Sequence, residues 1–462
     1  MFIFRKIRIS YWLLQSFLGR YKRYIMTAFI AGSALSLVLW ISLRYLVPVL
    51  FPSRIIIGFV GSYEPSRLPP SVQSLISSGL TRIDESGEIL PSASSSWESN
   101  SEGTRYFFHL QDNLTWHDGD NFVAHDVDYQ FKDVVIAPAD SKLLKVELSE
   151  PFAPLPALFA RPLLKTGLVG IGPYRVASIV LKEKTVDRIV LSPFDNPRTV
   201  TDERTGKTIL EFRFYQSPSA AVTAFKLGEI EELWNISSPD ELQGYPDTEI
   251  TEHIQFDRFL AVYYNVEHPL LKAKEFRQAL SYAIPALEGR KVISPIPETS
   301  WAHYASVRDY KYNVELATTL MERASVGTQS GNLTIATFPE YVDIAQTIAA
   351  SWNELGVPTD TRVIHSFQPA SPNRGEPDFA VLLGVQEISY DPDQYQLWHS
   401  TQRETNISHY NNPKIDKLLE EGRKETDKEK RLEIYREFQR YLVDDAPVRF
   451  LIHPVMYTIK RK

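Results

Sequence analysis

The strongest constraint on how this chain folds is a run of 20 residues without a charged side chain, Tyr24–Leu43. A helix of that length spans the hydrocarbon core of a bilayer. Eight Lys and Arg residues and no Asp or Glu occur up to Arg54, and most of them precede the run. By the positive-inside rule we expect a cytoplasmic basic segment over 1–23, a single transmembrane anchor over 24–52, and an extracytoplasmic body.

A cleaved signal peptide is the alternative interpretation of this segment. Its apolar run is longer than a signal peptide needs, and the small-x-small site Ala31–Gly32–Ser33 lies inside the run rather than after it. We therefore favour an uncleaved anchor.

The composition of the body excludes several functions. Beyond Arg54, 42 Lys and Arg residues face 57 Asp and Glu residues, and an acidic body of this kind is a poor partner for nucleic acid. The chain has no cysteine, which excludes disulfides, thiolate metal sites, a cysteine nucleophile and lipid attachment through a thiol.

Alternating strand and helix patterns along the body predict an α/β fold. A compact strand–helix–strand unit is expected over 333–364, with the helix Tyr341–Leu355 closed by Gly356. Asn412 is expected to cap one late helix, and Thr426 with Glu429 to form a capping box for the next. Further strands are predicted over Arg54–Val60, Arg105–Leu110, Leu210–Tyr215, Phe259–Asn265 and Val448–Ile459.

The sequence contains none of the usual catalytic motifs: no Gly-x-Ser-x-Gly, Ser-x-x-Lys, His-Glu-x-x-His or phosphate-binding Gly-x-x-x-x-Gly-Lys. Trp116–Gly119 places a His beside a carboxylate, which we interpret as a tight turn rather than a metal site or a general base. We assign no catalytic residue, no metal and no cofactor.

An ordered series of short motifs resembles the extracellular solute-binding proteins of family 5, the oligopeptide- and dipeptide-binding components of ABC importers. The series covers almost all of residues 55–460, and its members include Leu75–Asp84, Trp116–Gly119, Ala124–Val127, Gly172–Tyr174, Ala224–Glu229, Phe276–Ala283, Tyr390–Asp393 and Ala446–Pro447.

This resemblance implies a two-lobed, type II clamshell α/β fold of the periplasmic-binding-protein kind. Lobe 1 would span 53–258, with a shortened subdomain between Lys132 and Gly172, and lobe 2 would span 259–447. Residues 448–462 would return as a strand to lobe 1. It also implies a monomer that binds a peptide or related small solute and passes it to ABC permease subunits in a bacterial membrane.

The site departs from the family pattern. The segment Gly384–Pro392 matches a Gly-Trp-x-x-Asp stretch whose Asp pairs with a peptide's amino group, but Val385 replaces the Trp and Ile388 the Asp. An ammonium buried against isoleucine would be unpaired at a cost of several kcal/mol. Either Glu387 takes that role in a shifted register or the ligand has no free amine.

We therefore expect the ligand to contact Glu387, Tyr390 and Asp391 from lobe 2, with Tyr63 and Glu64 facing them from lobe 1. Asp391–Pro392 can equally form only a turn. A sensory or scaffolding ectodomain that has lost transport is the second interpretation, motivated by Ile388. A third, an anchored hydrolase, rests only on Glu387, Asp391 and Asp393 lying close in sequence.

Overall fold

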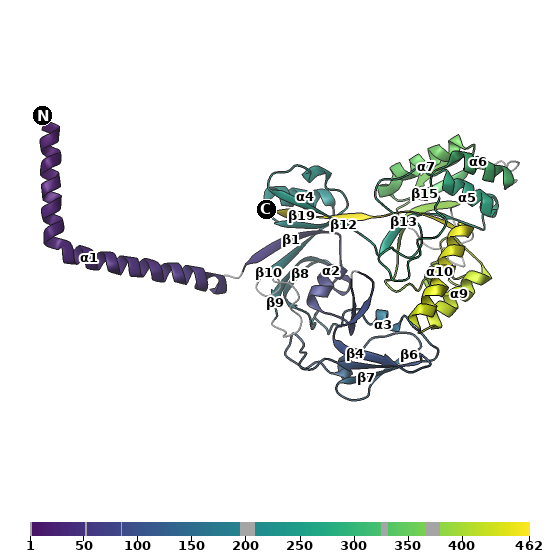
Figure 1. Ribbon diagram of the computed structural model, residues 1–462, viewed down its shortest axis with the longest axis horizontal. Coiled ribbons are helices and arrows are strands. Elements are labelled where there is room, and N and C mark those ends of the chain that lie inside the picture. Colours follow the sequence, from purple (N-terminus) through teal and green to yellow (C-terminus); the bar gives the residue numbers. More distant parts are fainter. Residues whose placement is uncertain (1, 51–52, 85, 195–207, 325–330, 366–378) are drawn as a thin grey trace.

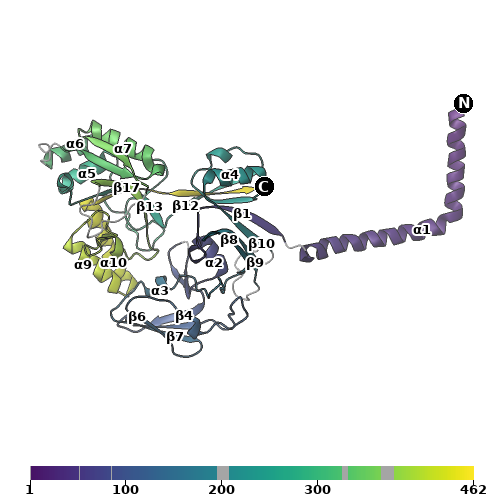
Figure 2. The same ribbon diagram turned by 180° about the vertical axis from the view of Figure 1, so that it is seen from behind.

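The computed structural model describes residues 2–50, 53–84, 86–194, 208–324, 331–365 and 379–462. Figure 1 shows two lobes side by side, a small subdomain below the first lobe, and the long N-terminal helix α1 (Phe2–Leu50) extending away from them. Figure 2 shows the same arrangement from behind, with the C-terminus on the first lobe.

Lobe 1 is organised around a mixed sheet. Its strands follow the order β12 (Thr248–Ile254), β19 (Val455–Arg461), β11 (Glu232–Ile236), β1 (Arg54–Val60), β10 (Ile209–Tyr215), β9 (Thr185–Pro193) and β8 (Tyr174–Lys182). The central strand β1 is nearly all apolar because it runs parallel to both β10 and β11 and is covered on its faces. The helices α2 (Pro70–Ile76) and α4 (Pro218–Leu227) belong to this lobe.

The small subdomain of lobe 1 lies between β1 and β8 in sequence. Its strands follow the order β4 (Ser94–Ser99), β5 (Arg105–Leu110), β7 (Leu143–Leu148) and β6 (Val134–Pro138), beside the pair β2 (Thr81–Ile83) and β3 (Ile89–Pro91) and the short helix α3 (Leu155–Leu158). Its own core is aromatic, with Phe108, Trp116, Phe122 and Phe159 fully buried. The strands β4 and β5 pair antiparallel as a hairpin, and β5 confirms the strand predicted over Arg105–Leu110.

Lobe 2 contains a second mixed sheet covered by helices. Its strands follow the order β14 (Arg290–Lys291), β18 (Val448–His453), β13 (Arg258–Tyr264), β17 (Val381–Glu387), β15 (Leu333–Thr337) and β16 (Thr359–Val363). Its helices are α5 (Lys274–Tyr282), α6 (Val314–Arg323), α7 (Val342–Glu354), α8 (Tyr395–Trp398), α9 (Pro413–Lys424) and α10 (Lys428–Asp445).

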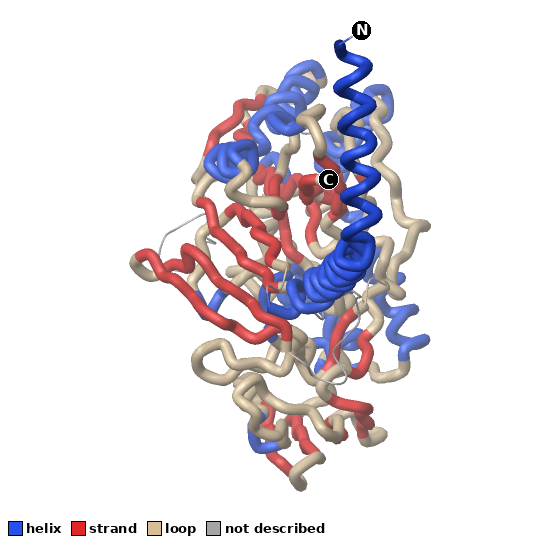
Figure 3. Tube along the Cα trace, turned by 90° about the vertical axis from the view of Figure 1, so that its left-hand side faces the viewer, coloured by secondary structure: helices blue, strands red, loops and turns tan. Residues whose placement is uncertain are grey.

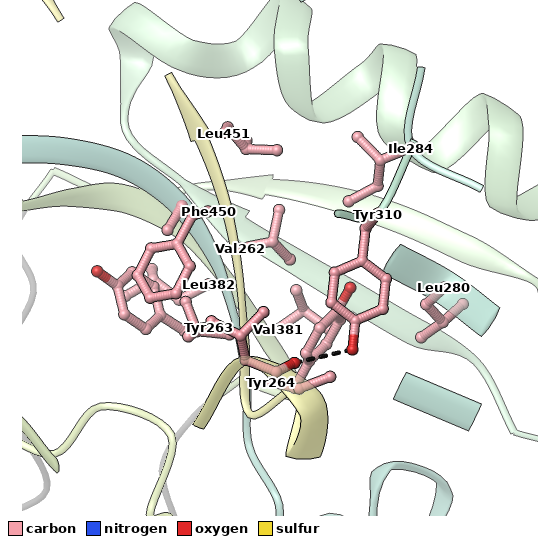
Figure 4. Close-up of a cluster of buried hydrophobic side chains, with 14 of the residues drawn as sticks. Val262, Tyr263, Tyr264, Leu280, Ile284, Tyr310, Val381, Leu382, Phe450 and Leu451 are labelled. Carbon is pink, nitrogen blue, oxygen red and sulfur yellow. Dashed lines mark hydrogen bonds between the residues drawn. The ribbon is translucent and has the colours of Figure 1, made fainter. Parts of the chain in front are cut away.

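The core of lobe 2 combines side chains of β13, α5 and β17, among them Tyr264, Leu280 and Val381, which Figure 4 labels. Trp352 of α7 is fully buried in the same core, and its indole N–H donates to Leu280 O (3.0 Å). Losing such a side chain to Ala costs about 3–5 kcal/mol. The predicted strand–helix–strand unit is confirmed as β15, α7 and β16, with Gly356 ending the helix at φ +87°.

In the part of the chain that the structure describes, two crossings connect the lobes. The first runs from β12 to β13, and the second from β18 to β19 through Pro454. The crossings touch each other, because Gln255 N donates to Pro454 O (2.9 Å). Since β18 pairs with β13 in lobe 2, only β19 returns to lobe 1. The lobe 2 boundary therefore falls at Pro454 rather than after residue 447.

The predicted capping box of the last helix is wrong by one residue. Asp427, not Thr426, caps α10, and its carboxylate accepts from the backbone N–H groups of Glu429 and Lys430. The sequence carries two adjacent residues that suit a cap, and the carboxylate also favours the positive end of the helix dipole. The predicted Asn412 cap of α9 is confirmed, since Asn412 accepts from Lys414 N (3.0 Å).

The N-terminal helix bends near its middle, which Figure 3 shows from the side. Among the described residues no single helix meets the length and apolarity expected of a membrane span. A pair of helical stretches, Gln15–Tyr24 and Met26–Ser42, meets that criterion together across a bend of 58°.

Candidate functional site

The carboxyl ends of parallel strands are where open α/β sheets place their ligand sites. Tyr63 follows the end of β1 in lobe 1, while Tyr341 and Tyr390 follow the ends of β15 and β17 in lobe 2. The charge of one residue, Arg258, acts on the pKa of all three tyrosines. Arg258 is therefore close enough to act electrostatically on groups of both lobes.

Arg258 is the first residue of β13, immediately after the first crossing between the lobes. It lies opposite Glu387, the last residue of β17, in the antiparallel ladder. Its Nη2 contacts Asp257 Oδ2 and Glu387 Oε1, both at 3.2 Å. Burial by itself would lower the pKa of the Arg258 guanidinium, but Asp257 and then Glu387 outweigh burial and raise that pKa.

The backbone of Arg258 is held by the hinge between the lobes. Its N–H donates to Gln255 O (3.3 Å), and its carbonyl accepts from the buried His453 Nδ1 (2.7 Å). The ring of Phe256 lies edge-on to His453 at 5.0 Å. The position of the guanidinium is therefore linked to the segments that must rotate if the lobes move.

Tyr63 is the lobe 1 member of this group. Burial raises the pKa of its hydroxyl, which donates to Val60 O (3.3 Å), and its ring packs against Phe59 and Phe214. The preceding Gly61 has φ +136°, and a Cβ at that position would lie 2.5 Å from the Tyr63 hydroxyl. Glycine is thus required for the chain to fold the tyrosine back over the end of β1.

Tyr341 and Tyr390 contribute two further rings from lobe 2. Burial raises the pKa of both hydroxyls, and the charge of Arg258 opposes that rise. Tyr390 as a whole is nevertheless 53% exposed. The loop around Gly87 in lobe 1 approaches it, since a Cβ on Gly87 would lie 3.9 Å from Tyr390 O.

The structure separates the five site residues predicted from the sequence. It brings Tyr63, Glu387 and Tyr390 together around Arg258, as described above. Glu64 lies exposed in the loop after β1, where its carbonyl accepts from Arg67 N (2.9 Å).

Asp391 lies in the interior of lobe 2 instead. It is 3% exposed, and Arg431 Nη1 and Nη2 donate to its two carboxylate oxygens (2.9 and 2.6 Å). The same carboxylate accepts from Asp393 N (2.9 Å), which forms the turn proposed as the alternative for Asp391–Pro392. Asp393 in turn binds Arg423 (2.8 Å). The carboxylates grouped by the hydrolase interpretation are thus each paired with a different arginine.

Sequence reasoning missed Arg258, Asp257 and Tyr341. Asp257 and Arg258 immediately precede the predicted strand Phe259–Asn265, at the predicted boundary between the lobes, so their position at that boundary was a usable signal. The Ile388 side chain is buried, and the backbone N–H of Ile388 donates to Asp257 O (2.8 Å). The residue that departs from the family pattern therefore lies next to the Asp257–Arg258 segment.

The lobes also touch far from the hinge, where the turn between α9 and α10 meets the small subdomain. Ala153 N donates to Arg423 O (2.9 Å), and Lys424 pairs with Glu150 (2.8 Å). Lys428 pairs with Glu88 nearby. The group around Arg258 therefore lies in a molecule whose lobes are joined on two sides (Figure 1).

Trp116–Gly119 forms the predicted turn. Gly119 has φ +94°, and its N–H donates to Trp116 O (2.9 Å). His117 Nε2 is bound to Gly172 O (3.0 Å), and burial lowers the pKa of the imidazole. Within the described part of the chain, no group of three or more His, Cys, Asp and Glu side chains is placed to hold a metal ion.

Two α/β lobes, two crossings between them and polar groups from both lobes at one point define the class of two-lobed solute receptors. The family model described as bacterial extracellular solute-binding proteins, family 5 Middle, matches residues 88–147 and 138–406. The chain therefore belongs to the bacterial extracellular solute-binding proteins of family 5, as its motifs indicated.

Individual relatives are distant but cover nearly the whole chain. Di/tripeptide-binding protein 1 of Pseudomonas aeruginosa is 22% identical over 501 residues, covering 90% of this chain and 92% of the relative. The ABC transporter substrate-binding protein CtaP of Listeria monocytogenes has the same fold, with a TM-score of 0.75, 22% identity, and coverage of 89% of this chain and 94% of that one. The oligopeptide-binding protein AppA of Bacillus subtilis, solved with a nonapeptide, also has this fold. Its TM-score is 0.67 and its identity 19%, and the match covers 89% of this chain and 95% of AppA.

Proposed function

We propose that this protein captures a peptide or a related small solute between its lobes and delivers it to an ABC importer. The observation that supports the proposal is the position of Arg258 at the crossing between the two lobes, where its charge acts on Tyr63 of lobe 1 and on Tyr341 and Tyr390 of lobe 2. Two relatives, a di/tripeptide-binding protein and a receptor solved with a nonapeptide, support a peptide as the solute.

Binding and release follow from the hinge. A solute that contacts Tyr63 on one side and the Arg258 group on the other stabilises the closed arrangement, because those contacts exist together only when the lobes are near. The contacts of α9–α10 with the small subdomain are polar and mostly exposed, so they add little to closure. A solute can therefore shift the equilibrium between open and closed lobes.

We further propose that residues 24–52 anchor the protein in the membrane as a single span, with 1–23 in the cytoplasm. The acid-free basic segment before an apolar run supports this orientation. The receptor would act as a monomer beside the permease, with lobe 1 over 53–258, lobe 2 from 259 to the second crossing, and the last strand back in lobe 1. Mass spectrometry of the membrane-extracted protein tests the anchor, since cleavage would remove the first residues.

A non-transporting sensory or scaffolding ectodomain is the second candidate function. The replacement of the amine-binding Asp by the buried Ile388 favours it. Uptake of a solute that depends on this gene and on a permease would contradict this second candidate.

Thermal unfolding of the full chain in lipid nanodiscs tests the first proposal. A ligand at about 100 times its dissociation constant stabilises the folded state by about 2.7 kcal/mol. We expect a pool of di- to nonapeptides to raise the unfolding temperature. No shift with any peptide pool, nor with free amino acids or metal chelates, would contradict solute capture.

A further inference from the structure

Arg258 has hydrogen-bonding capacity left over. A guanidinium carries five N–H donors. Among the described residues its hydrogen-bond acceptor is Asp257, reached from Nη2 (3.2 Å) and Nε (3.4 Å), while Glu387 Oε1 forms an ion pair with Nη2 at 3.2 Å. Nη1, with two N–H groups, has no acceptor in the described part of the chain. The group is thus charged, partly exposed and incompletely satisfied.

Glu387 is a weakly held counter-ion. Its side chain is 75% exposed, and it makes one contact with Arg258 in the cross-strand position. Ion pairs at this exposure contribute little, because water and salt screen them. Moving Glu387 away from Arg258 into solvent therefore costs little free energy.

We propose that Arg258 receives a carboxylate of the bound solute and that Glu387 is the internal counter-ion which this carboxylate displaces. The inference rests on the proposed function and narrows the solute to one with a free carboxylate. A planar guanidinium binds a carboxylate through two parallel hydrogen bonds, and Nη1 with Nη2 offers that geometry. Asp257 remains in place to orient the guanidinium.

The surroundings of Arg258 suit this role. The Arg258 side chain is only 28% exposed, and partial exclusion of water strengthens a charge-assisted hydrogen bond. The backbone of Arg258 is fixed by Gln255 and His453 at the hinge. A carboxylate bound here is therefore recognised at the point about which the lobes rotate.

Two alternative roles for Glu387 can be distinguished by experiment. If Glu387 instead binds the amino group of a peptide, its neutralisation must weaken peptide binding. If Glu387 competes with the ligand for Arg258, its neutralisation must strengthen binding of carboxylate-bearing peptides and leave amidated ones unchanged. The two roles predict opposite signs for one substitution.

The experiment uses the full chain in nanodiscs and one tripeptide mixture prepared twice, with free and with amidated C-termini. Calorimetry compares their affinities. For the natural sequence we expect the free-acid mixture to bind at least about tenfold more tightly, the size of one charge-assisted hydrogen bond. R258Q should remove that preference, and E387Q should raise free-acid affinity by about two- to fivefold, the range of an exposed ion pair.

R290Q is the matched control, because Arg290 forms a closer pair with Glu298 (2.6 Å) on the surface of the same lobe. It should leave the preference unchanged. Equal binding of the two mixtures to the natural sequence, or weaker free-acid binding by E387Q, overturns the inference while peptide capture stands. Failure of both mixtures to bind overturns the role of Arg258 together with peptide capture.

Discussion

Lobe 2 contains two arginine–carboxylate pairs whose carboxylates, Glu387 and Asp391, are only four positions apart in sequence but differ in burial and in role. Asp391 and Arg431 are both nearly fully buried, joined by two hydrogen bonds of 2.9 and 2.6 Å, with Arg431 Nε also bound to Gly422 O (2.8 Å). Glu387 and Arg258 are partly exposed and share one contact of 3.2 Å.

The difference lies in how completely each arginine is satisfied. A buried pair is stable only when its remaining donors and acceptors have partners, and Arg431 meets this condition through Gly422 and Tyr435. Arg258 does not meet it within the described residues. We infer that the end of β17 leaves Glu387 beside the lobe boundary, free for exchange, whereas the loop after β17 turns Asp391 inward, where it stabilises lobe 2.

Breaking the buried Asp391–Arg431 pair, called the inner pair here, should have the largest effect on the free energy of unfolding. D391N leaves Arg431 buried without its counter-ion, and removing one partner of a buried pair costs about 3–5 kcal/mol of unfolding free energy. Urea unfolding of the full chain measures it, with D360N as the control. Asp360 is an exposed residue of β16 whose side chain accepts from Asn332. A loss below about 1 kcal/mol for D391N would contradict the structural role of Asp391.

These two pairs also show what could be predicted from the sequence. Local patterns placed β1, β15, α7 and the Asn412 cap, because each depends on neighbouring residues. The family could be identified from the ordered motifs, because they are distributed along nearly the whole chain. The role of Asp391 was not predictable from the segment around it, because its partner Arg431 lies 40 residues away on α10.

Arg258 was missed for the same physical reason. Its contact with Glu387 arises from the register of β13 on β17, which long-range packing sets and which no local pattern reports. The second crossing was misplaced because the apolar alternation runs on through Val448–Ile459. The only sequence signal that the chain leaves one sheet for the other is Pro454, which has no backbone N–H to donate to a neighbouring strand and lies between β18 and β19.

Breaking the partly exposed Glu387–Arg258 pair, the outer pair, should affect ligand binding rather than stability. R258Q should lower the affinity for free-acid tripeptides by about tenfold, or about 1.4 kcal/mol, and change the unfolding free energy by less than about 1 kcal/mol. Calorimetry and urea unfolding of the same preparation measure the two quantities. R258K keeps the charge but not the planar fork, so it should recover part of the affinity. A large loss of stability in R258Q would place Arg258 with the inner pair.

The pH dependence of stability should sharpen the link between Arg258 and the hinge. Burial lowers the pKa of His453, whose Nδ1 donates to Arg258 O, with Glu298 acting to raise that pKa and Arg290 to lower it. The unfolded chain therefore takes up the proton first as the pH falls below about 6.5, and stability falls with it, by at most about 1.4 kcal/mol per pH unit for each such group.

Urea unfolding between pH 7.5 and 5.0 tests this slope. H453Q removes the titrating group and should give a shallower decline than the natural sequence. H109Q is the control, because His109 is an exposed residue of β5 that pairs loosely with Glu98 (3.9 Å). Identical slopes for H453Q and the natural sequence would show that the hinge histidine does not titrate on unfolding in this range.

The smallest expected effect is the coupling within the outer pair itself. A double-mutant cycle of R258Q and E387Q should give a coupling of about 0.2–1 kcal/mol in unfolding free energy, and 1 M NaCl should reduce it toward zero, because the pair is open to solvent. The same cycle for R431M and D391N should give a larger coupling that salt leaves nearly unchanged, since water does not reach that pair. If the outer coupling equals the inner one or resists salt, Glu387 is not an exchangeable counter-ion. A ligand carboxylate would then have to compete with a structural ion pair for Arg258.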